Sequence, residues 1–268
     1  MRLAKPPKLD VSDWQVPPYK INQFRPKRTE YCVCIPVINE GTRLKKQLDR
    51  MRPFSKDIDI IISDKGSSDG STDPKFLRSK NVRALITLTG QGRQGSQLRA
   101  GSSFAIKDGY QGIIILDGNN KDGVEAIPSF IKKLEEGYDY IQGSRFARGG
   151  KHANTPMSRF LGIRFVASPL LSLAAGYWYT DVTNGFRGVS KKYILHPRLK
   201  PFRDEFVGYE FLMYLTVRAK RLGLKTLEIP VNRVYPRGMT PTKIVGIRNK
   251  LDMLLKLFKV VLGHFNPN

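Results

Sequence analysis

Three clusters of polar residues directly follow apolar runs in the first half of the chain. They are Pro36, Asn39 and Glu40, then residues 64–69, and then residues 117–122. In an open parallel sheet, ligands bind beyond the carboxyl ends of the strands, so these clusters are the first candidates for a binding site. A single Asp after a strand is usually a turn or N-cap residue. Three such clusters at one edge of a sheet favour a ligand site instead.

The net charge indicates what kind of ligand to expect. Lys and Arg number 46 against 23 Asp and Glu, which gives a formal net charge of +23. Such a balance is typical of proteins that meet nucleic acid, a lipid surface or phosphorylated substrates. The sequence has no zinc-ligand spacing, RNP-type aromatic segment or recognition-helix motif, so we expect no nucleic acid partner.

The elements that must position these clusters can be read from apolar runs that alternate with helical patterns. Because the strand-like runs are continuous rather than alternating, they predict an α/β fold with a mostly parallel sheet flanked by helices on both faces. Strands are expected at 31–37, 58–63, 82–88, 112–117 and 138–144, and helices at 95–107 and 127–134. Residues 1–29, with five Pro among basic residues, are expected to form an arm, and order to begin near Glu30, where a domain spanning 30–232 starts.

The second half of the chain is more helical. An apolar helix is expected around 157–177, another helix at about 205–222 and a strand at 226–231. The longest stretch without charge, residues 165–180, has 16 residues and includes Pro169. A bilayer span needs roughly 18 to 20 residues, so we expect no transmembrane helix.

The segment 233–268 predicts a basic amphipathic helix. Between residues 232 and 268, seven Lys and Arg stand against the single acid Asp252. Such a helix suits an anionic membrane surface, but the same stripe would serve a helix docked on its own core, and the sequence leaves both open. The apolar stripe consists of Ile244, Ile247, Leu251, Leu254, Phe258, Val261 and Phe265.

The cysteines indicate the compartment. Cys32 and Cys34 lie two apart in a predicted strand, so their side chains point the same way and are poorly placed to form a disulfide. Reduced thiols favour the cytoplasm, and the basic C-terminal segment favours the cytoplasmic face of a membrane.

One glycine-rich segment suggests a different class of enzyme. Residues 90–95, GQGRQG, follow a predicted strand and open a helix, as a dinucleotide fingerprint does. That fingerprint belongs at the first strand of its fold, whereas two strand–helix units precede this one. A nucleotide-dependent oxidoreductase is thus the lesser alternative, and phosphate contact by Gly92 and Arg93 is compatible with either reading.

Seven ordered segments across about 210 residues carry a family resemblance. They are CIPVINEG, IISDKGSSDGST, IILDGNNKDG, IQGSRF, TDVTNGFRGVSKK, GYEF and EIPVNRVYPRGMTPTK. In these segments the chain resembles family 2 glycosyltransferases of the GT-A fold, most of all the dolichol-phosphate mannose synthases and related polyprenyl-phosphate glycosyltransferases. The resemblance implies transfer of a sugar, with inversion, from a UDP- or GDP-sugar to a polyprenyl phosphate. Relatives with appended transmembrane helices suggest that a separate membrane partner serves this chain.

The resemblance also assigns the donor site. It implies that Asp64 reads the nucleotide base and that Pro36, Asn39 and Glu40 line the nucleotide pocket. Arg145 and Arg187 match arginines that lie near phosphates, the alternative for each being an ion pair with a carboxylate. Arg237 and Lys243 keep the spacing of the family's R-x-x-G-x-S-K segment, with Thr240 in place of its glycine, and are expected to close over the donor.

The metal motif departs from the family's pattern. Asp117 matches the first acid of the DxD motif that holds Mg²⁺ or Mn²⁺, but Asn119 stands where the second Asp is expected. Lys121 follows two positions later, and its ammonium could share the phosphate charge with the cation or replace it.

The acceptor decides how much catalysis is needed. A phosphomonoester is anionic near neutral pH and can attack without a general base, whereas a sugar hydroxyl needs one. Asp181 is the candidate base, and its alternative role is to cap a turn. The candidate catalytic residues are therefore Asp117, Asp181 and Arg145. The second hypothesis is therefore transfer to a hydroxyl of a glycan or lipid-linked saccharide.

Overall fold

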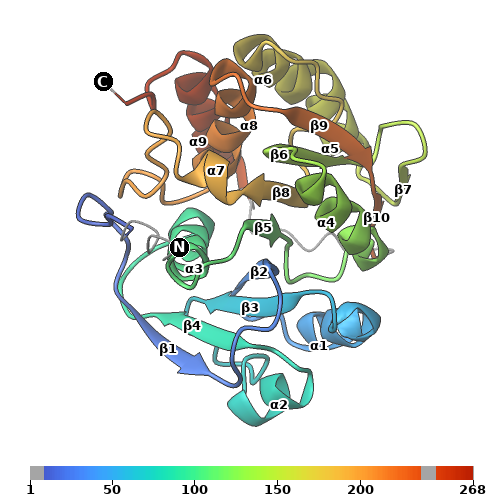
Figure 1. Cartoon of the computed structure of the whole chain (residues 1–268). Helices are drawn as coiled ribbons and strands as arrows, with labels where there is room; N and C mark the ends of the chain where they lie inside the picture. Colours follow the sequence, from blue (N-terminus) through green and yellow to red (C-terminus); the bar gives the residue numbers. More distant parts are fainter. Residues whose placement is uncertain (1–8, 237–245, 268) are drawn as a thin grey trace.

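A computed structural model describes residues 9–236 and 246–267 of the chain. Within these residues an eight-stranded sheet has the order β1-β4-β3-β2-β5-β8-β6-β9, and β7 and β10 form a separate pair (Figure 1). The strands are β1 Tyr19–Gln23, β2 Tyr31–Val37, β3 Asp59–Asp64, β4 Ala84–Leu88, β5 Gly112–Ile115, β6 Tyr140–Ser144, β7 Lys151–Ala153, β8 Arg187–Ser190, β9 Thr226–Pro230 and β10 Asn232–Val234.

The predicted sheet is confirmed as mostly parallel. β2 pairs in parallel with β3 and β5, β3 with β4, and β6 with β9. The exceptions are β1, which is antiparallel to β4 at one edge, and β8, which is antiparallel to both β5 and β6. Because β8 runs in the opposite direction, its first residue, Arg187, lies opposite Ile115 and Gln142 near the ends of those strands. The turn before β8 therefore reaches the same rim as the carboxyl ends of the parallel strands.

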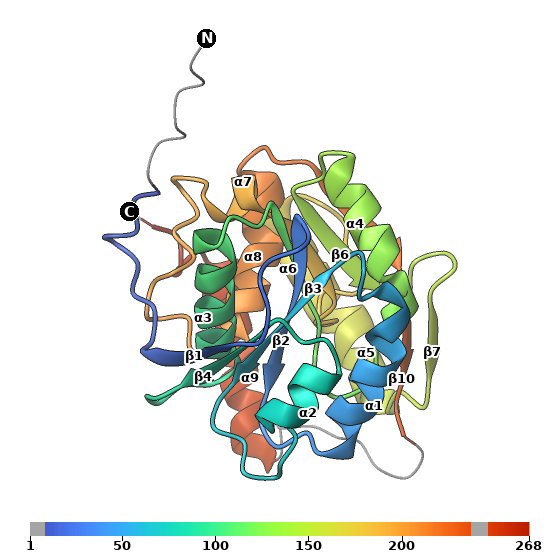
Figure 2. The ribbon, with the colours of Figure 1, turned by 60° about the horizontal axis from the view of Figure 1, so that its bottom comes forward.

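Helices cover both faces of the sheet, as the continuous apolar strands predict (Figures 1 and 2). Successive residues of β2 alternate between the two cores: Cys32 and Cys34 pack with the layer of α3, α6, α8 and α9, and Val33 and Ile35 with that of α1, α2 and α4. Both cysteines are free and buried. The helices are α1 Thr42–Met51, α2 Pro74–Ser79, α3 Gln94–Lys107, α4 Ile127–Glu135, α5 Met157–Gly162, α6 Ser168–Ala175, α7 Lys191–Ile194, α8 Glu210–Arg221 and α9 Gly246–Val261, with short turns η1 Arg52–Phe54, η2 Val124–Ala126 and η3 Ile163–Ala167.

The prediction that order begins near Glu30 is wrong. β1 adds an edge strand to the sheet, with Ile21 opposite Ile86 of β4. Further upstream, the ring of Trp14 stacks on Phe202 at 3.9 Å between ring centroids. Prolines flank β1 on both sides and mask its pattern in the sequence, yet an edge strand tolerates them because one of its sides needs no hydrogen-bond partner.

The helical run Met157–Ala175 differs from the sequence prediction. It comprises α5, η3 and α6, and by length and composition it could cross a membrane, although none was expected. The uncharged stretch begins only at residue 165 because Arg159 and Arg164 lie in the first part of this run. The helical run is therefore longer than the uncharged stretch suggests. Only 22% of its most apolar window is buried. The core helix of a soluble protein passes the same length test, so the exposure of this run is its more informative property.

The C-terminal helix α9 is docked on the core and also has exposed apolar side chains. Leu257 and Val260 are buried in the core with α8 and α6, so the helix is docked. Leu251, Leu254 and Phe258, three members of the predicted stripe, remain exposed instead. α9 therefore presents an apolar surface to solvent in addition to the one it buries.

Candidate active site

The carboxyl ends of three neighbouring strands bring the polar clusters to one rim of the sheet. Val37 at the end of β2 pairs with Asp64 at the end of β3, while Cys34 of β2 pairs with Ile115, two residues before Asp117. Asp64 and Asp117 thus lie on the same edge, on either side of β2. A Cβ built on Gly118 would lie 3.1 Å from Val37 Cγ2, so the loop after β5 packs closely on β2.

Asp64 and Asn39 hold the loops at this rim in shape. The Asp64 carboxylate accepts hydrogen bonds from the backbone amides of Gly66 and Ser67 and, at 2.6 Å, from the Ser67 hydroxyl. Asn39 adopts a positive φ of 49°, and its side-chain oxygen accepts from the Ser68 amide at 2.9 Å. The two loops are therefore tied to each other. Pro36 is buried in β2, whereas Glu40 lies beside it in an ion pair with Arg43.

Asp117 is the centre of a polar network. Its Oδ1 accepts from Gln94 Nε2 at 3.0 Å, and its Oδ2 accepts from Asn119 Nδ2 and Arg233 Nη2, each at 3.3 Å. Burial alone would raise the pKa of Asp117, but Arg233 and Lys121 outweigh it and hold the pKa below its ordinary value. The carboxylate is thus kept ionised at neutral pH.

Arg233 joins Asp117 to a second buried acid. Its Nη1 donates to Asp122 Oδ1 at 2.5 Å and to Asn184 Oδ1 at 3.3 Å. The Lys121 ammonium lies 5.0 Å from the centre of the Tyr235 ring. Arg233 has no role in the sequence analysis, and its partner Asp117 is 116 residues away along the chain.

Gly185, in the turn before β8, makes room for Asp117. A Cβ at this position would lie 2.9 Å from Asp117 Oδ1 and 3.1 Å from its Cγ. Real Cβ atoms tolerate such distances only if the neighbour moves. The glycine of the NGFR segment is therefore required by the position of the carboxylate.

Arg145 and Asp181, two candidate catalytic residues, form an ion pair with each other. Arg145 Nε lies 2.6 Å from Asp181 Oδ2, its Nη2 lies 3.3 Å from Oδ1, and both side chains are almost fully buried. Asp181 Oδ1 also accepts from the Thr183 hydroxyl. Since both carboxylate oxygens are engaged, the structure argues against Asp181 as a general base. For Arg145 it favours the alternative of an ion pair with a carboxylate, and Asp181 positions the Arg145 guanidinium.

Arg187 is held by the backbone of the protein itself. Its guanidinium is buried and donates to the backbone carbonyls of Asn184, Val182 and Leu212. Every nitrogen of the group has a partner, so the sequence-based assignment to phosphates is not supported. Arg187 instead fixes the turn that carries Gly185. Arg237 and Lys243 lie outside the described residues.

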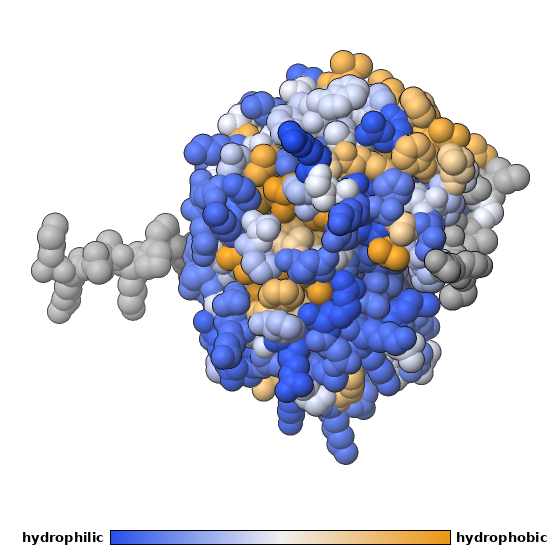
Figure 3. All heavy atoms as spheres, turned by 90° about the vertical axis from the view of Figure 1, so that its right-hand side faces the viewer, coloured by the Kyte–Doolittle hydropathy of each residue, from blue (hydrophilic) through white to orange (hydrophobic). Residues whose placement is uncertain are grey.

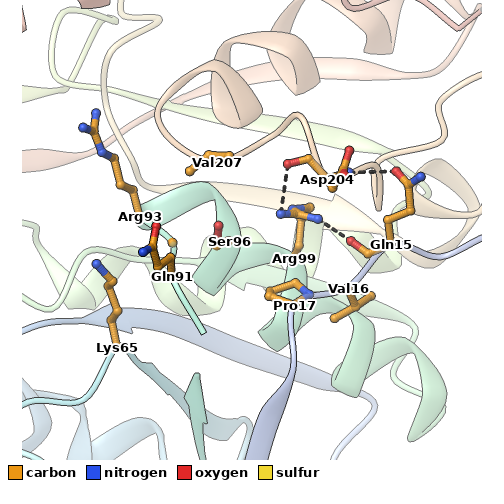
Figure 4. A pocket seen from close by; sticks show the side chains of 11 residues that line it. Gln15, Val16, Pro17, Lys65, Gln91, Arg93, Ser96, Arg99, Asp204 and Val207 are labelled. Atoms are coloured by element: carbon orange, nitrogen blue, oxygen red, sulfur yellow. Dashed lines mark hydrogen bonds between the residues drawn. The ribbon is translucent and has the colours of Figure 1, made fainter. Parts of the chain in front are cut away.

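An open pocket of about 620 Å³ borders this rim beside the start of α3. Lys65, Gln91 and Arg93 line one side of it (Figure 4). On the other side, Arg99 bonds the backbone carbonyls of Gln15 and Asp204, so its charge is already engaged. Asp117 is not among the lining residues. The pocket therefore lies next to the charged network around Asp117 and does not contain it.

The glycines of the 90–95 segment serve close packing. A Cβ on Gly95 would lie 2.6 Å from the carbonyl oxygens of Phe206 and Gly208, and one on Gly92 would lie 2.6 Å from Ser96 Cβ. The Ser96 amide donates to the Val207 carbonyl at 3.2 Å. This segment therefore holds α3 against the loop before α8. Arg93 itself is exposed at the start of α3.

The GYEF segment connects this rim to α9. Burial, followed by the charge of Asp117, raises the pKa of Tyr209 to about 12. Glu210 is buried, and its Oε2 lies 3.1 Å from Lys256 Nζ of α9. Asp252 of α9 lies 3.7 Å from Arg93.

The residues around Asp117 fit a divalent cation poorly. Both Asp117 oxygens accept hydrogen bonds, and the Asn119 amide oxygen accepts from the Lys121 backbone amide at 3.2 Å. A divalent ion about 5 Å from the Arg233 guanidinium would meet a repulsion of about 7 kcal/mol at an effective dielectric constant of about 20. Among the described residues, no group of three or more His, Cys, Asp or Glu is arranged to hold a metal.

Relatives of known activity cover most of the chain. The family model described as glycosyl transferase family 2 matches residues 32–196. The undecaprenyl-phosphate mannosyltransferase of Micrococcus luteus is 28% identical over 79% of this chain and 86% of its own length. The polyprenol monophosphomannose synthase of Mycolicibacterium smegmatis is 25% identical over 74% of this chain and 75% of its own.

The fold also has solved counterparts. Glucosyl-3-phosphoglycerate synthase from Mycobacterium tuberculosis, solved with Mn²⁺, UDP and phosphoglyceric acid, superposes with a TM-score of 0.63. The match covers 90% of this chain and 80% of that one at 16% identity. At this identity the likeness concerns the fold, and it confirms the GT-A class that the sequence predicts.

Proposed function

This chain belongs to glycosyl transferase family 2, and on that premise we propose that it transfers a sugar from a nucleoside diphosphate sugar to a polyprenyl phosphate, with inversion at the anomeric carbon. The observation that carries the proposal is the position of Asp117. Its carboxylate lies on the rim shared with Asp64, within a cluster that includes Arg233 and Lys121. The names of the mannosyltransferase relatives support the acceptor.

The donor would lie across the rim between the two acids. Asp64, Asn39 and the loops they hold would receive the nucleoside, while the half-buried Lys65 and exposed Arg93 lie beside it with free access to phosphates. Helix α3 has its N-terminus at the same place, where the backbone amides and dipole favour an anion. UDP and GDP are both compatible with these groups.

The acceptor supplies its own nucleophile. A polyprenyl phosphate oxygen attacks the anomeric carbon, the bond from that carbon to the diphosphate breaks, and the electron pair stays on the departing diphosphate. No proton has to be removed, which agrees with the engagement of Asp181 by Arg145. The remaining tasks are alignment and stabilisation of the leaving charge.

The fold neighbour and this chain differ in how well they suit a bound metal ion. The mycobacterial synthase was solved with Mn²⁺, and the sequence predicts Mg²⁺ or Mn²⁺ at Asp117 and Asn119. Because the donor atoms of both residues are engaged, we assign no step of the mechanism to a metal ion.

A lipid acceptor requires contact with a membrane surface. Figure 3 shows apolar side chains gathered along one edge of the molecule. In the run Met157–Ala175, Phe165 is 72% and Leu173 is 76% exposed, and Arg164 is exposed beside them. α9 adds an exposed apolar surface with basic residues. We propose that these surfaces hold the enzyme on an anionic membrane, on its cytoplasmic face, where a separate membrane partner could also bind.

The proposed function is tested by supplying radiolabelled UDP- and GDP-sugars with either polyprenyl phosphate or saccharide acceptors. We expect label in a glycolipid only when polyprenyl phosphate is present. Label transferred only to a saccharide would establish the alternative, transfer to a hydroxyl of a glycan or lipid-linked saccharide. That alternative needs a base, for which the engaged Asp181 is poorly suited.

A further inference from the structure

Two cations and two acids lie together where a metal would be expected. The guanidinium of Arg233 contacts Asp122 at 2.5 Å and Asp117 at 3.3 Å. Lys121 adds a second positive charge, and its ammonium lies 5.0 Å from the centre of the Tyr235 ring. The formal charges of these four residues cancel without a metal ion, and all but Asp117 are buried.

Arg233 occupies the place that a bridging cation takes between carboxylates. It is held by two acids and by the Asn184 amide oxygen, and it lies in β10, the strand that follows β9 in the chain. Its Nε–H has no hydrogen-bond partner among the residues that the structure describes. A phosphate oxygen could accept a charge-assisted hydrogen bond from this donor.

We propose that Arg233 and Lys121 take the place of the divalent cation, so that the nucleoside diphosphate is bound and released without a metal ion. This inference rests on the proposed function. As the bond between the anomeric carbon and the diphosphate breaks, the electron pair remains on the β-phosphate oxygen, and the guanidinium and ammonium stabilise that charge. The products are a glycosyl polyprenyl phosphodiester and a nucleoside diphosphate.

Isothermal titration of the chelator-treated full chain with UDP and with GDP tests the inference, each run with EDTA and then with excess Mn²⁺ or Mg²⁺. We expect one nucleotide to bind in EDTA, with a dissociation constant that changes less than about threefold when metal is added. Binding that requires metal, or that tightens tenfold or more with it, would overturn the inference and leave the proposed function standing. Absence of binding under every condition would overturn both.

Variants of Lys121 make the test independent of activity. Lys121→Gln should weaken diphosphate binding about tenfold or more in EDTA, because a charge-assisted contact is lost, while the nucleoside without phosphates binds as before. Lys220→Gln, which removes an exposed lysine of α8, is the matched control and should change neither. Equal diphosphate affinity in Lys121→Gln and the control would contradict a role for this ammonium.

A variant designed to bind a metal ion tests the inference from the opposite direction. The double variant Asn119→Asp with Lys121→Gln restores the second acid of the motif and removes one cation. We expect Mn²⁺ to tighten its diphosphate binding at least tenfold, a response that the unmodified chain lacks. A variant with an unchanged melting temperature and no response to Mn²⁺ would show that Lys121 is not what replaces the metal.

Discussion

Removing the Asp181 carboxylate should destabilise the protein strongly. Arg145 and Asp181 are 1% and 0% exposed, so Asp181→Ala leaves a buried guanidinium without its counter-charge and the Thr183 hydroxyl without an acceptor. Breaking a buried pair in this way costs about 3–5 kcal/mol. With an unfolding entropy of about 2.1 cal/mol/K per residue, a 268-residue chain should lose about 5–9 °C in melting temperature.

Thermal unfolding of two further variants gives the comparison. Glu136→Ala removes one partner of the half-exposed Lys133–Glu136 pair and should shift the melting temperature by less than about 2 °C. Asp181→Asn keeps the shape and one acceptor oxygen but not the charge, so it should lie between the two. If Asp181→Ala and Glu136→Ala have the same melting temperature, the Arg145–Asp181 pair does not stabilise the fold as its burial implies. A proton-accepting role for Asp181 would then be open again.

Three further outcomes are expected. Burial would raise the pKa of Tyr235, but Arg233, Arg145 and Arg159 outweigh it and lower the pKa to about 7. An unfolded tyrosine titrates near pH 10. The stability linked to Tyr235 should therefore be fully present above about pH 10 and be lost as the pH falls through about 7. The measurement is the difference in tyrosinate absorbance between the unmodified chain and Tyr235→Phe, and a difference that titrates near pH 10 would refute this expectation. Gly185→Ala should lower kcat/KM at least tenfold by displacing Asp117, whereas Gly162→Ala, where a Cβ meets nothing within 4 Å, should leave it unchanged; equal rates would show that the Asp117 carboxylate is not held in place by this contact. The double variant Phe165→Ser with Leu173→Ser should reduce retention on anionic liposomes more than deletion of residues 246–267 does, since the side chains of the run Met157–Ala175 are more exposed than those of α9. Unchanged retention of the double variant would show that this run does not bind the membrane.

Local pattern was sufficient for the central strands. Continuous apolar runs predict β2 as Tyr31–Val37, and β3 and β5 to within two residues, because a strand buried on both faces leaves no polar residue to blur its ends. Since parallel strands share an edge, the same pattern places Asp64 and Asp117 together. β1 was missed because an exposed edge strand among prolines has no such run.

The partners of buried charges could not be predicted from the sequence. Arg187 and Arg145 look alike in their motifs, yet one donates to three carbonyls and the other pairs with Asp181. Arg233 reaches Asp117 across 116 residues, a distance over which periodicity carries no information. The only available signal was its position directly after the EIPV strand, next to a cluster of acids that the sequence already assigned to the rim.

The stereochemistry and linkage of the product test the central claim most directly. The glycolipid formed from a nucleotide α-sugar and polyprenyl phosphate should be examined by proton and phosphorus NMR. We expect a β-configured anomeric carbon coupled to the phosphorus of the lipid, because attack by the acceptor phosphate on the face opposite the departing diphosphate inverts that carbon. An α-configured product, or a sugar joined to a hydroxyl with no coupling to phosphorus, would contradict it.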